Sequence, residues 1–128
     1  IFTPRRVVKM MVDLLEENNP GCFDNPNHTF ADLYMKSGLY ITEIVKRLYR
    51  SEAIKSTFPD DKERIRHILR KQVYGMAPTR IIYLIATNYI LGFDPELKDE
   101  TRNFVQADAA EAAKSGALQQ LVDEKFGE

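Results

Sequence analysis

Cysteine and histidine are scarce in this chain, which has one cysteine and two histidines in 128 residues. The single Cys22 excludes an internal disulfide and any zinc site built from several thiolates, and it suits a reducing compartment. His28 and His67 lack companions at the spacing of a metal site or a catalytic triad. We therefore assign the histidines no chemistry and expect a cytoplasmic protein.

Long apolar runs and an excess of one charge are also lacking. No run approaches the ~20 apolar residues of a membrane span, and no charged-then-apolar signal pattern opens the chain. A net charge of −1 gives no overall attraction for phosphates, so contact with nucleic acid would need a local basic patch. We expect one domain, residues 1–128, with no membrane partner. Because the chain begins with Ile1 and not with an initiator Met, we also expect it to belong to a longer parent protein.

Helical spacing of apolar residues recurs along the chain. Thr3 is a candidate N-cap with Pro4 at the first helical position, and apolar residues follow at helical spacing to Leu15. A second stripe predicts a helix from about residue 41 to 51, with Ile41, Ile44, Val45 and Leu48 on its inner side. A third helix is predicted over residues 61–70.

The most apolar helix is predicted after Thr79, which caps it, and before Gly92, which ends it. Its apolar residues leave almost no polar face, so we expect it to be buried on most sides. A final helix carries Leu118, Leu121, Val122 and Phe126.

Strands alternate with these helices, at residues 29–33, 72–76 and 103–107, without hairpin signals between them. This order predicts an α/β fold with three short parallel strands, right-handed crossovers and flanking helices. Sheets of this class usually have about five or six strands. We therefore expect further strands beyond Glu128.

The segment after the first strand is the most informative part of the chain. Asp32 ends the strand, Ser37 and Gly38 form a turn, and an amphipathic helix begins near Ile41. In α/β proteins such a loop lies at the carboxyl edge of the sheet, where the partly positive N-terminus of the next helix faces a ligand. The sequence therefore predicts a nucleotide-type pocket here.

Four segments resemble those of amino-methylating DNA methyltransferases, which use S-adenosylmethionine (SAM). The segment 32–40 is similar to the Asp-Pro-x-x-Gly-Ser-Gly-x-Phe loop of this family, and residues 37–44 to its Gly-Ser-Gly-x-Phe-Leu-x-Glu signature. Phe2-Thr3-Pro4 resembles the opening Phe-x-Thr-Pro. Residues 73–77 resemble the second-strand Tyr-Gly-Ile-Asp segment, and residues 105–109 the third-strand segment that ends in Asp.

The resemblance implies a partial Rossmann-like SAM-methyltransferase fold that spans nearly the whole chain. It also implies that the opening segment touches the methionine end of SAM, the loop wraps methionine and ribose, the second strand meets the ribose hydroxyls and the third strand meets adenine. The implied cofactor-binding residues are Phe2, Thr3, Pro4, Asp32, Tyr34, Lys36, Ser37, Gly38, Met76, Ala77, Asp108 and Ala109.

Three departures from the family pattern bear on activity. The catalytic Asn-Pro-Pro-Tyr segment is absent from the sequence, so we name no catalytic residue and expect the chain alone to transfer no methyl group. Lys36 stands where the family has its first loop glycine, and Ala77 replaces the ribose-binding acid. Loss of one charge-assisted hydrogen bond, worth about 1.5–3 kcal/mol, would weaken SAM binding about ten- to a hundredfold.

We therefore expect the SAM-binding part of an adenine-N6 DNA methyltransferase from a restriction-modification protein, which meets DNA through the intact parent and flips the target base out of the duplex. The alternative is a non-catalytic methyltransferase-like module with a degenerate pocket, which serves packing or DNA positioning. A dinucleotide oxidoreductase is disfavoured because the Gly-x-Gly-x-x-Gly turn is missing. An open edge at residues 29–33 predicts self-association of the chain.

Individual residues keep structural alternatives. The alternative for Asp32 is a loop former, for Asp108 the cap of the following helix, and for Lys36 a solvated lysine rather than a contact to a carboxylate. Tyr34 and Tyr40 are suited to stacking on a ligand or to packing. The basic series from Lys62 to Lys71 would suit DNA phosphates, but interleaved acids favour a solvated helix face.

Overall fold

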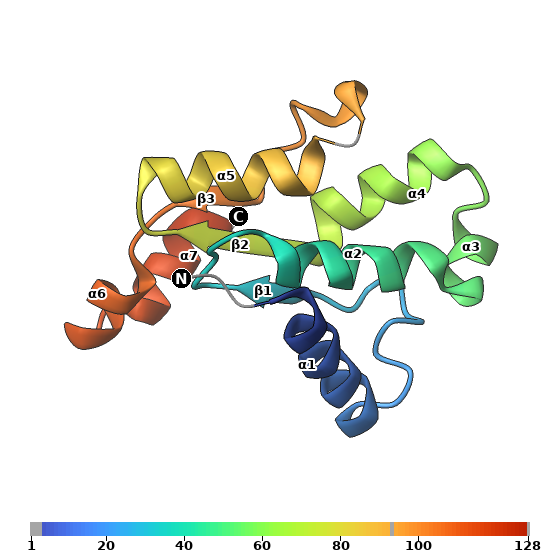
Figure 1. Cartoon of the computed structure of the whole chain (residues 1–128), viewed down its shortest axis with the longest axis horizontal. Coiled ribbons are helices and arrows are strands. Elements are labelled where there is room, and N and C mark those ends of the chain that lie inside the picture. Colours follow the sequence, from blue (N-terminus) through green and yellow to red (C-terminus); the bar gives the residue numbers. More distant parts are fainter. Residues whose placement is uncertain (1–3, 93, 128) are drawn as a thin grey trace.

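Three parallel strands form one sheet at the centre of the molecule (Figure 1). The computed structural model describes residues 4–92 and 94–127. Strands β1 (Phe30–Asp32), β2 (Val73–Ala77) and β3 (Phe104–Gln106) lie in the order β1-β2-β3, with Phe30 opposite Val73 and Gly75 opposite Phe104. The predicted parallel α/β arrangement is confirmed, and each observed strand starts within one residue of its predicted start.

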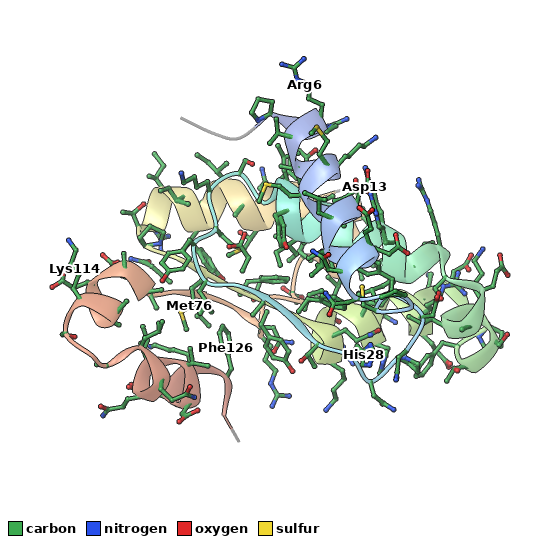
Figure 2. The ribbon with its side chains drawn as sticks, turned by 90° about the horizontal axis from the view of Figure 1, so that it is seen from below. Arg6, Asp13, His28, Met76, Lys114 and Phe126 are labelled. Carbon is green, nitrogen blue, oxygen red and sulfur yellow. The ribbon has the colours of Figure 1, made fainter. Side chains whose placement is uncertain are left out.

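Helices connect and cover the strands on both faces. They are α1 (Arg5–Asn18), α2 (Leu39–Arg50), α3 (Glu52–Thr57), α4 (Asp61–His67), the π-helical turn η1 (Ile68–Gln72), α5 (Arg80–Leu91), the 3-10 turn η2 (Pro95–Leu97), α6 (Ala109–Lys114) and α7 (Leu118–Phe126). Figure 2 shows α2 and α5 on one side of the sheet and α7 on the other. There the ring of Phe126 packs edge-on against Tyr74 of β2, with 5.3 Å between the ring centroids.

Local sequence explains several of these elements. All four residues of the predicted stripe on α2 are buried, because α2 packs against the sheet, α1 and α5. Thr79 caps α5 by accepting a hydrogen bond from the backbone N–H of Ile82, and Gly92 ends it, as predicted. The short α3 was not predicted. Ser51 begins it by accepting from the N–H of Ile54, while its own hydroxyl donates to Asp24 at 2.7 Å.

Two buried amides fix the amino-terminal end of β2. The side-chain amide of Asn103 donates to the carbonyls of Arg70 at 2.8 Å and Val73 at 3.2 Å. The amide of Gln72 donates to the carbonyls of Asn25 and His28, each at 3.0 Å. These bonds replace water for buried backbone carbonyls and tie the loop before β1 and the start of β3 to the middle strand.

The expectation that α5 is buried on most sides is wrong. Ile81 is 68% exposed and Leu84 is 47% exposed, because only the face that carries Ala86, Ile90 and Leu91 meets the sheet and α2. On α1 the buried residues are Val8 and Val12, whereas Met10, Met11 and Leu14 are exposed. Both helices therefore present apolar side chains to solvent.

The loop after β1 is held by close backbone contacts. The N–H of Met35 donates to the carbonyl of Met76 at 2.9 Å, and the buried Met35 side chain lies where a Cβ on Gly75 would stand. Gly38 has a positive φ of 87°, and a Cβ on it would come within 2.8 Å of the carbonyl oxygen of Ala86. Only glycine therefore satisfies both the backbone conformation and the packing of α5 at this position.

We predict that Gly38→Ala lowers the free energy of unfolding by about 2–5 kcal/mol, because left-handed strain of about 1–2 kcal/mol adds to overpacking of about 1–3 kcal/mol. Gly116→Ala is the matched control, since Gly116 has a φ of 76° but nothing within 4 Å of an added Cβ. The control should lose only about 1–2 kcal/mol of unfolding free energy, which is the cost of the left-handed strain. Urea denaturation measures both, and equal losses would show that contact with α5 does not constrain Gly38.

Candidate functional site

A cleft of about 460 Å³ opens at the carboxyl edge of β1. Its walls are Val8 and Met11 of α1, residues 31–34 at the end of β1, and residues 36–40 of the loop and the start of α2. The cleft has the size of a small-molecule site, for which about 300–1,000 Å³ is usual. It lies where α/β sheets usually bind ligands, outside the carboxyl end of a strand.

Asp32 is the carboxylate of this cleft. It is the last residue of β1, and its Oδ1 accepts a hydrogen bond from the N–H of Tyr34 at 3.0 Å. Burial raises the pKa of Asp32, and the bond from Tyr34 opposes that shift. Burial also raises the pKa of Tyr40, with a further contribution from the charge of Asp32. A partly desolvated carboxylate thus faces the cleft with one hydrogen bond from its own chain.

The N-terminus of α2 forms the opposite part of the wall. Gly38 is its N-cap, no side chain caps the helix there, and the first turn contains no acid. Ser37 accepts from the N–H of Leu39 at 3.4 Å, and the side chain of Lys36 is exposed. The partly positive helix end and Lys36 favour an anionic group, whereas Asp32 favours a cation or a hydroxyl donor. The cleft therefore suits a ligand that carries an anionic group together with a cation or a hydroxyl donor.

The structure brings together five of the sequence-predicted site residues. Asp32, Tyr34, Lys36, Ser37 and Gly38 all line this cleft. The exposed Pro4 precedes α1 and does not line it. Phe2 and Thr3 lie outside the described residues.

The other four predicted residues lie outside the cleft lining, two at the end of β2 and two at the start of α6. Met76 and Ala77 are both 0% exposed, so their side chains belong to the core. Asp108 lines a separate depression, and it caps α6 by accepting from the N–H of Glu111 at 3.0 Å. Ala109 is buried in the first turn of α6. Asp108 thus takes the capping role that the sequence offered as the alternative to a contact with adenine.

Sequence reasoning missed the part of the wall that α1 supplies. Val8 and Met11 line the cleft beside Ala31. Apolar spacing indicated that α1 is amphipathic but not which of its residues would meet the loop. Tyr40 was expected to stack or pack; it lines the cleft, where burial and then the charge of Asp32 raise the pKa of its hydroxyl.

The basic series from Lys62 to Lys71 is largely paired with acids of the same chain. Lys62 binds Glu96 at 2.8 Å, Arg70 binds Glu100 at 2.6 Å, and Arg66 lies 3.7 Å from Glu100. Arg64 pairs with Asp61. The series is therefore largely ion-paired, mostly with residues 96–100, and Arg64 is buried, whereas the interleaved acids indicated a solvated helix face.

The described part of the chain contains no cluster of three or more metal-binding side chains. The two histidines contact backbone: Nδ1 of His28 lies 3.1 Å from the Cys22 carbonyl, and Nε2 of His67 lies 2.7 Å from the Pro26 carbonyl. In residues 4–92 and 94–127, no helix combines the length and the hydropathy required to cross a bilayer.

The chain was also compared with known proteins. No protein-family model matches it, and neither a curated protein nor a solved structure does. The assignment of a function therefore rests on the residues and on the geometry of the cleft.

We predict that Asp32→Asn stabilises the protein at neutral pH. The folded-state pKa of Asp32 is raised by burial, so its charge costs stability above that pKa, and this cost disappears as pH falls below the unfolded value of 3.8. Asn keeps the acceptor for Tyr34. Urea unfolding at pH 7 and pH 3 should show a higher free energy of unfolding for Asp32→Asn only at pH 7.

The control is Asp99→Asn, at an exposed aspartate outside the cleft, which should change little at either pH. Equal destabilisation of Asp32→Asn at both pH values would contradict a stability cost from the partly desolvated charge of Asp32.

Proposed function

We propose that this chain is the SAM-binding part of an adenine-N6 DNA methyltransferase of a restriction-modification protein. The observation that carries the proposal is that the loop 32–40, which carries the family resemblance, forms the cleft at the carboxyl edge of β1. The parallel order β1-β2-β3 supports it, because it agrees with a partial Rossmann-like sheet.

The charges of SAM complement this cleft. Its methionine end carries an ammonium and a carboxylate, and its ribose carries hydroxyl donors. The carboxylate would lie against the N-terminus of α2 and Lys36, and Asp32 would accept from the ammonium or a ribose hydroxyl. The protein would thereby orient the methyl donor, and positioning would supply most of its contribution to catalysis.

The target base and the residues that grip it belong to the intact parent in this proposal. The family's Asn-Pro-Pro-Tyr segment does not occur in the sequence, so nothing in the chain corresponds to the group that orients the attacking nitrogen. In the parent, the flipped adenine would present its amino group to the methyl of SAM.

A second candidate is a non-catalytic module with a degenerate pocket. It is favoured by Ala77, which replaces the ribose-binding acid of the family and is fully buried, and by Lys36, whose long side chain replaces a glycine. In this case the cleft would retain its shape for packing or DNA positioning and would bind SAM poorly.

We predict that SAM or its demethylated product binds the chain weakly and that Asp32→Ala abolishes the signal, because the carboxylate is the cleft's acceptor for the cationic part of the ligand. Isothermal calorimetry or ligand-observed NMR measures binding. Asp99→Ala removes an exposed acid outside the cleft, and this variant should bind SAM as the unsubstituted chain does. Absence of binding at millimolar SAM, in a sample shown to be folded, would favour the degenerate module.

We also propose that the chain associates with a second copy of itself through the edge of β1. Within residues 4–92 and 94–127, β1 pairs with β2 only, and its Ala31 is exposed. The exposed Met10 and Leu14 of α1 add apolar area close to this edge, since the neighbouring Met11 lines the cleft beside Ala31. Exposed apolar area costs about 25 cal/mol per Å² in water, so a second copy would bury it favourably.

The predicted result is a dimer or larger species at micromolar concentration, measured by analytical ultracentrifugation. Met10→Lys with Leu14→Lys should shift the chain to monomer, because lysine ammonium groups resist burial. Ile81→Lys with Leu84→Lys, at exposed apolar positions of α5, should leave association unchanged. If the unsubstituted chain is monomeric, or if only the α5 variant dissociates to monomer, association does not use the β1 edge.

A further inference from the structure

A second cleft, of about 690 Å³, lies at the other end of α2 and is lined mostly by basic side chains. Lys46 and Arg50 come from α2, Lys55 from α3 and Arg64 from α4, with Asp61 as the one carboxylate. The four cations converge from three helices although the net charge of the whole chain is −1. The surface thus has a local positive region that composition does not reveal.

Two of the four cations keep their charge available, whereas Lys55 and Arg64 each have a carboxylate partner. Lys46 and Arg50 form no ion pair within the part of the chain that the structure describes. Lys55 lies 3.6 Å from Glu52, whose side chain is 90% exposed. By contrast, the neighbouring Arg47 is held by three carboxylates, those of Asp13, Glu16 and Glu43.

Arg64 gives the cleft a fixed positive charge. It is 3% exposed, its guanidinium lies 4.4 Å from the ring centre of Tyr49, and its Nη1 donates to the carbonyl of Phe58 at 2.9 Å. Its Nε is buried and has no hydrogen-bond partner among the described residues. A buried guanidinium is costly unless its charge is compensated, and among the described residues Asp61 is the carboxylate that compensates it. Arg64 therefore shapes the wall of the cleft, and Lys46 and Arg50 are the cations left to meet an anion.

We propose that this basic cleft binds a backbone phosphate of nucleic acid. Lys46 and Arg50 are one helical turn apart and point from the same face of α2, a spacing of about 5–6 Å between Cβ atoms that lets both engage one phosphodiester or two successive ones. The cleft is open, as a polymer requires, and Lys55 extends the positive surface onto α3. Contacts of this kind position nucleic acid without reading its sequence.

This site is separate from the SAM cleft and does not rest on SAM binding. The two lie at opposite ends of α2, which at 12 residues is about 18 Å long. Asp32→Ala, which should abolish SAM binding, should therefore leave nucleic-acid binding unchanged, so that failure of one proposal is distinguishable from failure of the other.

The test is fluorescence anisotropy of a short labelled DNA duplex of mixed sequence, titrated with the 128-residue chain from about 50 to 200 mM salt. Lys46→Gln with Arg50→Gln should weaken binding about tenfold at the lowest salt and reduce the slope of log K against log salt by about 0.9 for each lost phosphate contact. Arg102→Gln with Lys114→Gln is the matched control: it removes the same two charges from exposed positions outside the cleft.

Retention of binding and of the salt slope by the control, with weaker binding and a smaller slope in the cleft variant, supports the proposal. Equal losses in the two variants would show that net charge alone governs binding and would overturn it. Inorganic phosphate distinguishes the source of the anion: if it shifts the NMR signals of Lys46 and Arg50 while duplex DNA binds no more tightly than phosphate, the nucleic-acid assignment is overturned. Thermal melts confirm that each variant is folded, and Lys46→Gln alone provides a second, milder change with the same expected direction.

Discussion

The packing of Met35 against β2 is the constraint on which the candidate SAM site depends. Its N–H bonds the Met76 carbonyl and its side chain occupies the space beside Gly75, so the loop after β1 is attached to the middle strand rather than free in solvent. The loop then reaches Gly38, which meets α5 too closely for any side chain. The cleft is what remains between this fixed loop, the end of β1 and α1. Its shape is therefore preorganised by the core, and little ordering entropy would oppose binding.

This packing changes how the loop residues are interpreted as contacts to a ligand. A glycine in such a loop is commonly explained by close approach of a ligand, but the backbone conformation and the contact with α5 fully account for Gly38. Asp32 differs, because its burial costs free energy and its own chain offers it one hydrogen bond. The carboxylate, rather than the glycine, is the stronger indication of a ligand. The fully buried Ala77 argues in the opposite direction, since the middle strand offers no acid at the corresponding place.

Features set by neighbouring residues in the sequence were predictable, and features set by distant ones were not. The inner face of α2, the capping roles of Thr79 and Asp108 and the three strands follow from local patterns. The apolar sequence of α5 suggested burial on most sides, but burial depends on which elements cover a helix, and Ile81 and Leu84 face solvent. The contribution of α1 to the cleft, and Glu96 and Glu100 as partners of the basic series, required the tertiary structure. The basic cleft was missed because its cations are spread over three helices.

Helix α2 relates the two clefts. Its N-terminus, with no side-chain cap, faces the candidate SAM site, and its last turn carries Arg47 and Arg50. Cations at a helix C-terminus are favourable because they compensate the helix dipole, so the position of Arg50 has an explanation that needs no ligand. The dipole does not explain Lys55, which lies on another helix, whereas the buried Arg64 is compensated by Asp61 and by the carbonyl of Phe58. Convergence of Lys55 with Lys46 and Arg50 on one open cleft is therefore the feature that dipole compensation leaves unexplained and that binding of a phosphate would account for.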